Sequence, residues 1–170
     1  GFLEISKPEV SDRVRVAFDP LGEQVVVLGC GTVTAVGSGL IHPFDDEDVI
    51  AGQGTIGLEI LEDVPEVEGI IIPVGGGGLI SGIATIVKKR NPRVNIIGVQ
   101  SAHAPSAFFS LKRKRIVEVN IRPTLADGIA LRRVGEITFP IIQKRVDKIV
   151  TVQEDEIASA ILMLMERKRL

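Results

Sequence analysis

The sequence predicts an open α/β fold in which helices flank a parallel sheet. The short, continuously apolar run at residues 69–74 and the largely apolar run at residues 94–99 are typical of strands that are buried on both faces. Helical patterns surround both runs, so strands and helices alternate along the chain. A parallel sheet with right-handed crossovers satisfies this order, and ligands of such sheets bind beyond the carboxyl ends of the strands.

Two helices are expected in the first half of this domain. One covers residues 48–61, with Asp45 or Asp46 as its N-cap. The other covers residues 79–90, between the two apolar runs, and Pro92 stops it. Each helix is therefore followed by a strand, as a parallel crossover requires.

The second half is less regular. A helix is expected to open at Pro105, and the stretch 117–131 shows no helical or strand period. A short helix is expected over residues 137–143. Residues 147–152 are then predicted to form the third strand of the sheet.

The last helix is predicted from two features. Thr151 and Glu154 have the spacing of a capping box, in which two side chains satisfy the free N–H groups of a helix start. Apolar residues then recur at helical spacing and are expected to form the core-facing side of this helix: Ile157, Ile161, Leu164 and Met165.

Residues 1–40 differ from the rest of the chain. They are rich in glycine and proline, and residues 24–28 form the only strand-like run that we predict there. We therefore divide the chain into a divergent segment, residues 1–40, and a domain, residues 41–170.

The composition excludes several classes of protein. The chain has 170 residues, 45% hydrophobic and 25% charged, and a formal net charge of −2, so neither nucleic acid nor a membrane is an expected partner. The basic run 112–115 is interpreted as a solvated helix end. Cys30 is the only cysteine, which excludes an internal disulfide and favours a reducing, cytoplasmic location. No apolar run is long enough to span a bilayer.

Four consecutive glycines are the main chemical signal: Gly75, Gly76, Gly77 and Gly78. Each ordered glycine costs roughly 0.5–1 kcal/mol relative to alanine, and a tight turn needs only one or two. Bare backbone can wrap closely around a phosphate, and a helix N-terminus favours the negative charge. We therefore predict that this tetraglycine loop, residues 75–78, binds phosphate. The alternative is a tight turn that packs the next helix close to the sheet.

The loop does not follow the common nucleotide-binding patterns. It is not a GxGxxG loop with an acidic residue downstream, and no lysine follows Gly78 as in GxxxxGK[ST]. A nucleoside triphosphate is therefore disfavoured. A nucleotide-binding domain that uses the loop in another way stays open as a minor alternative.

Five segments carry a family signature in order and spacing. They are residues 42–46 (HPFDD), 50–59 (IAGQGTIGLE), 73–84 (PVGGGGLISGIA), 124–130 (TLADGIA), and 146–150 with 154–157 (VDKIV and EDEI). Over residues 41–170 the chain resembles the threonine ammonia-lyases (threonine dehydratases) of the serine racemase-like group of fold-type II pyridoxal-phosphate (PLP) enzymes. The resemblance implies part of the large domain of the tryptophan synthase β-like fold, with residues 1–40 either a remnant of the small domain or unrelated sequence.

The resemblance also implies roles for single residues. The tetraglycine loop and Leu79 would hold the phosphate of PLP, in agreement with the prediction from the glycines alone. Gly128 would lie against the cofactor, where a side chain would collide. Phe44 would sit beside the pyridine ring, or else be a core aromatic residue. His42 would be structural.

The subgroup follows from Phe44 and from the run Gly98-Val99-Gln100-Ser101, which look more like threonine ammonia-lyases than serine racemases. Racemase-like members hold a divalent cation with carboxylates at the positions of Gln100 and Ser106. Because neither residue here is a carboxylate, we predict no metal site of that kind.

The implied reaction converts L-threonine to 2-oxobutyrate and ammonia, or L-serine to pyruvate. The family's Schiff-base lysine lies in a Ser-Phe-Lys-x-Arg-Gly motif, which does not occur in these 170 residues. Lys7 lacks the flanking residues, and we interpret it as an exposed lysine. No catalytic residue is therefore assigned, and the chain is expected to be inactive alone.

Two alternatives to the lyase stay open: a non-catalytic module derived from this fold that binds phosphate or a protein, and a serine racemase-like enzyme. The amino-acid substrates, threonine and serine, are expected partners of the complete enzyme. A homo-oligomer is also expected, because a partial sheet leaves an unpaired edge and exposed apolar faces.

Overall fold

The computed structural model describes residues 2–5, 14–18, 25–28 and 42–168. Their strands belong to two separate sheets. The first sheet is antiparallel and consists of β1 (Phe2–Ile5), β2 (Val14–Phe18) and β3 (Val25–Leu28). β3 confirms the strand expected over residues 24–28. Cys30 and Lys7 lie outside the described residues.

The second sheet is parallel and confirms the predicted fold class. It contains β4 (Gly69–Pro73), β5 (Asn95–Ser101) and β6 (Lys148–Val152), in that spatial order. The register pairs Ile71 with Ile97 and Val99 with Val150. All three strands therefore end at the same edge of the sheet, where the tetraglycine loop follows β4.

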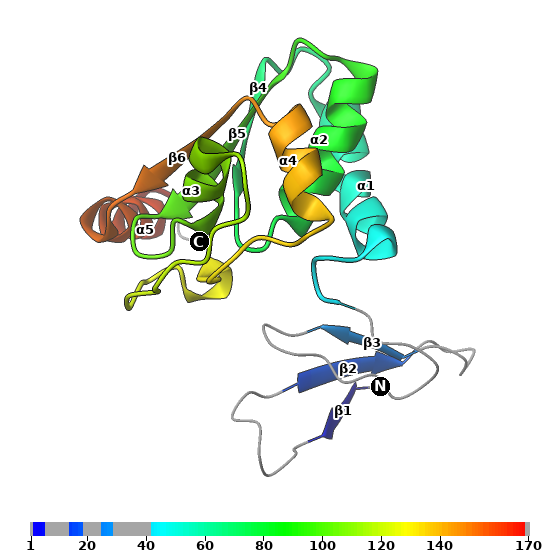
Figure 1. The fold of residues 1–170 in the computed structure, drawn as a ribbon. Helices are drawn as coiled ribbons and strands as arrows, with labels where there is room; N and C mark the ends of the chain where they lie inside the picture. Colours follow the sequence, from blue (N-terminus) through cyan, green and yellow to red (C-terminus); the bar gives the residue numbers. More distant parts are fainter. Residues whose placement is uncertain (1, 6–13, 19–24, 29–41, 169–170) are drawn as a thin grey trace.

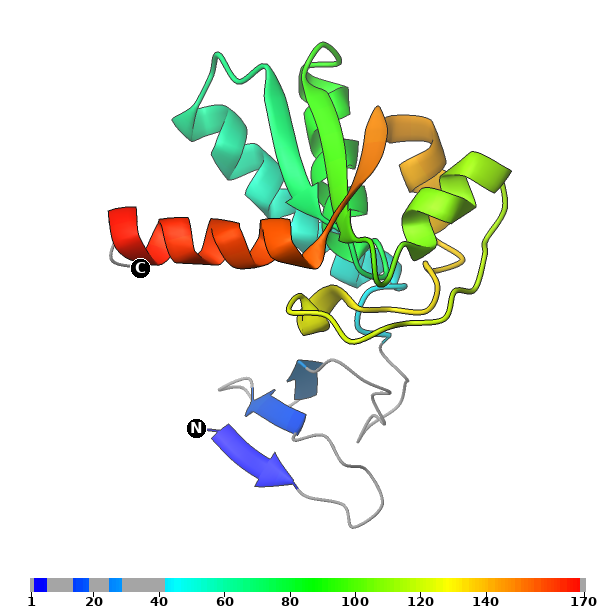
Figure 2. The same ribbon diagram turned by 90° about the vertical axis from the view of Figure 1, so that its left-hand side faces the viewer.

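Five helices and one short 3-10 turn, η1 (Asp127–Ile129), accompany this sheet in the described part of the chain. The helices are α1 (Glu47–Asp63), α2 (Gly78–Arg90), α3 (Ser106–Arg113), α4 (Thr138–Arg145) and α5 (Glu154–Lys168). α1 packs on α2, and α2 also contacts α4. Figures 1 and 2 show α5 on the opposite face of the sheet from α1 and α2. None of the described helices is long and apolar enough to cross a membrane.

The helix boundaries follow from the predicted signals. Asp46 is the N-cap of α1, and its carboxylate accepts hydrogen bonds from the N–H groups of Asp48 and Val49. α2 ends before Asn91, and α3 ends at Lys114, which adopts the left-handed conformation with φ of 53°. The basic residues 112–115 are exposed, as expected of a solvated helix end.

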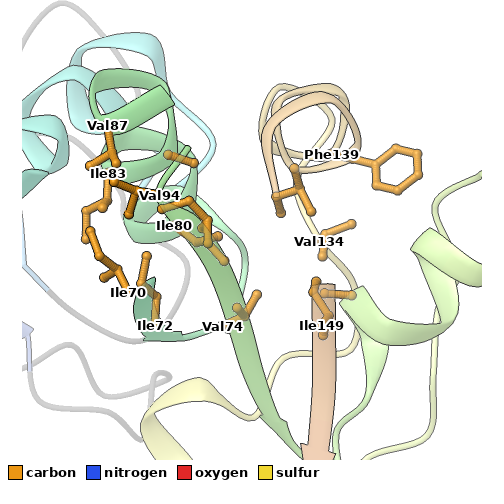
Figure 3. Close-up of a cluster of buried hydrophobic side chains, with 14 residues drawn as sticks. Ile70, Ile72, Val74, Ile80, Ile83, Val87, Val94, Val134, Phe139 and Ile149 are labelled. Carbon is orange, nitrogen blue, oxygen red and sulfur yellow. The ribbon is translucent and has the colours of Figure 1, made fainter. Parts of the chain in front are cut away.

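The core lies between the parallel sheet and the helices α2 and α4 (Figure 3). Ile72, Ile80, Ile96 and Ile142 are at most 2% exposed. Val134, Phe139 and Ile149 extend the same cluster toward β6. Burial of such side chains stabilises the domain by about 25 cal/mol for each Å² of apolar surface removed from water.

Three glycines allow α1 and α2 to pack closely. A Cβ at Gly82 of α2 would lie 2.4 Å from the backbone oxygen of Ile50 and 2.7 Å from the backbone nitrogen of Gly54. A Cβ at Gly54 would lie 2.9 Å from the Ile86 side chain, and one at Gly57 would lie 3.2 Å from the backbone oxygen of Ile83. Glycine at these positions therefore sets the distance between the two helices.

The start of β6 is fixed by Asp147. Its carboxylate accepts a 2.7 Å hydrogen bond from the N–H of Ile96 and forms an ion pair with Lys88, 2.7 Å away. Burial by itself raises the pKa of Asp147, but the Ile96 N–H and the Lys88 ammonium outweigh it and lower the pKa below its usual value. The ionised carboxylate thus joins α2, β5 and β6.

The prediction that the first strand is buried on both faces is wrong. Ile70 and Ile72 are buried, whereas Ile71 between them is 71% exposed. β4 is an edge strand, and successive side chains of a strand point to opposite faces. The face that carries Ile71 has no helix over it at this position in the described structure.

Two predictions for the last helix are also wrong. The predicted capping box pairs Thr151 with Glu154. In the structure the corresponding pair lies two residues later: the Glu156 carboxylate accepts a 2.7 Å hydrogen bond from the N–H of Gln153. The apolar side of α5 is not a core face, since Ile161, Leu164 and Met165 are 43%, 51% and 58% exposed. Helical spacing identified an amphipathic helix, but it does not reveal whether a partner surface is present.

Candidate functional site

The tetraglycine loop lies where β4 ends and α2 begins. Gly77 is the N-cap of α2 and has a φ of 102°, a conformation that favours glycine. No side chain caps this helix start. Within the described residues, the N–H groups of Gly76, Gly77 and Gly78 have no hydrogen-bond acceptor in the protein. The loop therefore presents free N–H groups together with the positive end of the α2 dipole.

Phe44 covers one side of the loop. A Cβ at Gly76 would lie 2.2 Å from the Phe44 ring, and a Cβ at Gly78 would lie 2.9 Å from the Phe44 backbone oxygen. Phe44 is itself half-buried. Two of the four glycines are thus required by contact with Phe44.

His42 fixes the turn that carries Phe44. Its Nδ1 accepts hydrogen bonds from the N–H of Asp45 at 2.9 Å and from the N–H of Phe44 at 3.4 Å. The His42 and Phe44 rings are in edge-to-face contact, with centroids 4.4 Å apart. The ring of His42 therefore acts structurally in this turn.

The remaining neighbours of the loop come from two later segments. A Cβ at Gly75 would lie 3.3 Å from the Cα of Ile129, in the turn that contains Gly128. A Cβ at Gly77 would lie 2.7 Å from the Ile142 side chain and 2.9 Å from Oγ1 of Thr138. The structure thus brings together the tetraglycine loop, Phe44 and the turn around Gly128.

Gly128 lies in η1, in the turn whose Ile129 approaches Gly75. A Cβ at this position would meet no atom of the described chain within 4 Å. The N–H of Gly128 donates a hydrogen bond to Oδ1 of Asp127 at 2.7 Å. The described residues therefore give no steric reason for glycine here, and contact with a cofactor stays a prediction.

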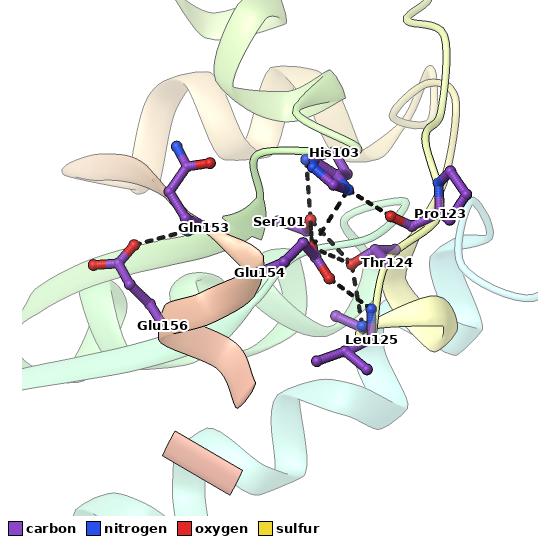
Figure 4. Close-up of polar contacts among 9 residues, drawn as sticks. Ser101, His103, Pro123, Thr124, Leu125, Gln153, Glu154 and Glu156 are labelled. Carbon is purple, nitrogen blue, oxygen red and sulfur yellow. Dashed lines mark hydrogen bonds and ion pairs between the residues drawn. The ribbon is translucent and has the colours of Figure 1, made fainter. Parts of the chain in front are cut away.

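Glu154 holds the segment that leads to Gly128 (Figure 4). Its Oε1 accepts hydrogen bonds from the hydroxyls of Ser101 and Thr124, both at 2.7 Å, and its Oε2 accepts from the N–H of Leu125 at 2.8 Å. His103 lies 3.8 Å from the same carboxylate and also contacts the carbonyl of Pro123. One side chain at the start of α5 thus joins the end of β5 to the loop before η1.

These hydrogen bonds make Glu154 unusually acidic. The Ser101 and Thr124 hydroxyls and the Leu125 N–H favour the ionised form and lower the pKa of Glu154 from 4.5 to about 2. Because the pKa is lower in the folded state, the carboxylate stabilises the fold above about pH 4.5. This stabilisation is lost as the pH falls from 4.5 toward 2.

We therefore expect Glu154→Gln to lower the free energy of unfolding at neutral pH and to flatten its decline in acid. Urea denaturation followed by circular dichroism, repeated across this pH range, measures both effects. Asp155→Asn is the matched control, because Asp155 lies in the same helical turn but makes no comparable hydrogen bonds in the described structure. An equal acid decline in the wild type and in Glu154→Gln would contradict this role.

Gln100 forms a neutral network at the end of β5. Its side chain is buried, donates to the carbonyl of Val74 at 3.1 Å and to Oγ of Ser106 at 3.4 Å, and accepts from the N–H of Phe108 at 3.0 Å. The Gln100 amide is thus paired entirely within the protein, and the absence of a metal site here stays a prediction. No group of three or more metal-binding side chains occurs among the described residues.

A family model of the pyridoxal-phosphate dependent enzymes matches residues 24–170. The chain belongs to this family. Proteins of the family depend on pyridoxal phosphate, as the resemblance predicted. The match also reaches further toward the N-terminus than the sequence signatures, the first of which begins at residue 42.

Two curated relatives are both called L-threonine ammonia-lyase. The one from Thermotoga maritima is 54% identical over 133 residues, covering 78% of this chain and 33% of the relative. The one from Geobacter sulfurreducens is 55% identical over 134 residues, covering 79% and 33%. The chain thus spans about a third of the length of these family members.

Solved structures of the family share the fold. The processed form of threonine deaminase isoform 2 from Solanum lycopersicum is 44% identical, with a TM-score of 0.74, over 76% of this chain and 38% of that protein. Maize serine racemase is 37% identical, with a TM-score of 0.74, over 77% and 41%. The architecture is thus common to deaminases and racemases of the family.

The tetraglycine loop fits the phosphate group of the family's cofactor. Its free N–H groups and the α2 dipole favour an anion, and bulky side chains are excluded by Phe44 and Thr138. Gly76, Gly77 and Gly78 would hold the phosphate, together with the start of α2 at Leu79. This fit rests on the backbone of the chain and requires no lysine.

Sequence reasoning missed several residues that shape this family site. From the sequence, Glu154 has only the spacing of a helix-capping residue, and no local pattern predicts a role for Thr138 or Gly82. The roles of these residues depend on partners far away in the sequence: Ser101 for Glu154, Gly76 for Thr138 and Ile50 for Gly82. The segments that contain Gly82 and Glu154 did carry family signatures, which was the available signal.

Proposed function

We propose that the tetraglycine loop binds the phosphate of pyridoxal phosphate and that this chain is part of a threonine ammonia-lyase. The observation that carries the proposal is the set of free N–H groups at residues 76–78, at the start of α2, in a chain of the PLP-dependent family. When bound, the cofactor supplies an electron sink for chemistry at the α-carbon of an amino acid.

The proposed reaction converts L-threonine to 2-oxobutyrate and ammonia, with L-serine as a second substrate that gives pyruvate. The identity of 54–55% to proteins called L-threonine ammonia-lyase supports this choice. A serine racemase-like activity is the alternative, because racemases share the fold. The neutral Gln100–Ser106 contact favours the lyase, since the cation-binding racemases that the sequence resembles use carboxylates there.

The phosphate site is tested with pyridoxamine 5′-phosphate, which cannot form a Schiff base with surface lysines. We expect equilibrium dialysis to show one bound molecule per chain, displaced by inorganic phosphate. Pyridoxamine without the phosphate is the matched ligand control. Equal binding of the two ligands would show that the loop does not recognise phosphate and would overturn the proposal.

The same purified chain can be assayed for threonine deamination. Because no Schiff-base lysine motif occurs in the 170 residues, we expect no 2-oxobutyrate from threonine and added pyridoxal phosphate. Borohydride reduction and peptide mapping should then find no single labelled lysine. Stoichiometric labelling of one lysine, with turnover, would show that the chain carries its own catalytic residue.

The chain is further proposed to self-associate through the face of the sheet opposite α2. Ile71 is 71% exposed on this face, and Leu162 and Met165 of α5 are 59% and 58% exposed. Exposed apolar surface of this kind is characteristic of interfaces. Sedimentation velocity should show a dimer or larger species, and a well-folded monomer at all concentrations would contradict this.

A further inference from the structure

Asp45 caps a helix that lies far from it in the sequence. Its Oδ2 accepts a hydrogen bond from the N–H of Glu136 at 2.7 Å, and its Oδ1 accepts from the N–H groups of Ile137 at 2.8 Å and Thr138 at 3.1 Å. These N–H groups form the start of α4, which has no side-chain cap from its own segment. A carboxylate at this helix end is favoured by both hydrogen bonding and the helix dipole.

The approach of Asp45 to α4 requires glycine at position 135. A Cβ at Gly135 would lie 2.0 Å from Oδ1 of Asp45. Asp46, the residue that follows Asp45 in the chain, caps α1 instead. The two adjacent carboxylates therefore serve different helices.

The start of α4 in turn holds the tetraglycine loop. Oγ1 of Thr138 donates a 2.7 Å hydrogen bond to the carbonyl of Gly76, and the N–H of Gly135 donates to the same oxygen at 3.1 Å. Thr138 is fully buried. Both donors therefore come from the segment that Asp45 fixes.

The orientation of the Gly76 carbonyl determines where the loop can bind an anion. In a trans peptide the C=O and the following N–H point in opposite directions, and the described chain contains no cis peptide bond. Two hydrogen bonds pull the Gly76 carbonyl toward α4. The N–H of Gly77 in the same peptide unit must therefore point away from α4, where it is free to bind a ligand.

We infer that Asp45 is a positioning residue for the tetraglycine loop, acting through α4: it fixes Gly135 and Thr138, which hold the Gly76 carbonyl and so direct the Gly77 N–H toward the phosphate. This inference rests on the proposed phosphate binding for its functional meaning. The hydrogen bonds that carry it are present without any ligand.

The test compares Asp45→Asn with Asp46→Asn, two isosteric changes at adjacent N-caps. We expect both to lower the thermal stability by a similar amount, because each removes a charged cap. Asp45→Asn is expected to weaken pyridoxamine 5′-phosphate binding about tenfold, because charge-assisted hydrogen bonds are replaced by weaker ones. Asp46→Asn should leave the affinity unchanged.

A second readout does not depend on ligand binding. In ligand-free protein labelled with ¹⁵N-glycine, Asp45→Asn should shift the amide signals of Gly76, Gly77 and Gly135, whereas Asp46→Asn should leave them in place. Thr138→Val removes the buried donor without changing the side-chain shape, and it should shift the Gly76 and Gly77 signals. The double variant Asp45→Asn/Thr138→Val should then shift the Gly77 amide signal little further than Thr138→Val alone.

The outcomes separate the two proposals. Unchanged glycine signals in Asp45→Asn, or equal effects of the two aspartate variants on these signals and on the affinity, would overturn the positioning role. Wild-type protein that binds no pyridoxamine 5′-phosphate would instead refute the proposed phosphate site, while the glycine signals would still decide whether Asp45 positions the loop.

Discussion

Gly82→Ala is expected to lower the free energy of unfolding of the domain by roughly 3 kcal/mol. This is the largest stability effect that we predict for a glycine-to-alanine substitution. The added Cβ would lie 2.4 Å from the backbone oxygen of Ile50 and 2.7 Å from the backbone nitrogen of Gly54. Backbone atoms cannot rotate aside as a side chain does, so α1 must move away from α2. The free energy of unfolding from urea denaturation measures this cost.

Gly52→Ala provides the matched control on the same helix pair. Gly52 lies within α1 on its exposed side, and a Cβ there would meet no described atom within 4 Å. Alanine should stabilise the helix by about 0.5–1 kcal/mol, because it loses less backbone entropy than glycine. If both variants changed stability in the same direction, close packing of α1 on α2 would not be the reason for Gly82.

Gly77→Ala is expected to abolish most of the phosphate affinity. The φ of 102° is unfavourable for any residue with a Cβ, at a cost of about 1–3 kcal/mol. The new methyl group would also lie 2.7 Å from the Ile142 side chain and 2.9 Å from Oγ1 of Thr138. The loop can relieve the unfavourable φ or the close contacts only by rotating the peptide units that present the N–H groups. The affinity for pyridoxamine 5′-phosphate should therefore fall by at least about tenfold.

The control for this change is Gly69→Ala, at the other end of β4. A Cβ at Gly69 would lie 3.7 Å from the nearest backbone atom, an ordinary contact. Its phosphate affinity should equal that of the wild type. Retained affinity in a folded Gly77→Ala protein would show that the left-handed turn is not needed to form the phosphate site.

The sequence by itself determined the order of the elements and the location of the loop. The apolar runs at residues 69–74 and 94–99 correspond to β4 and β5, because burial of aliphatic side chains is a local compositional signal. The four glycines also stood out without a structure, since their conformational cost requires a reason. The family signatures then supplied the cofactor.

The tertiary structure alone decided which side chains hold the site together. Asp45 and Asp46 are equivalent as helix caps in the sequence, yet Asp46 caps the adjacent α1 and Asp45 caps α4, more than 90 residues away. Glu154 has the spacing of a capping residue but bonds to Ser101 and Thr124. Such contacts depend on how the elements pack, and sequence spacing reports only neighbours within one element.

The exposure of Ile71 and of the apolar side of α5 has the same origin. Periodicity shows that a helix or strand has an apolar side, but only the packing shows whether another element covers it. The local pattern thus determined the loop, the helices and the strands of this protein. The long-range hydrogen bonds of Asp45, Thr138 and Glu154 decided how the loop is held, because they form only when the chain is folded.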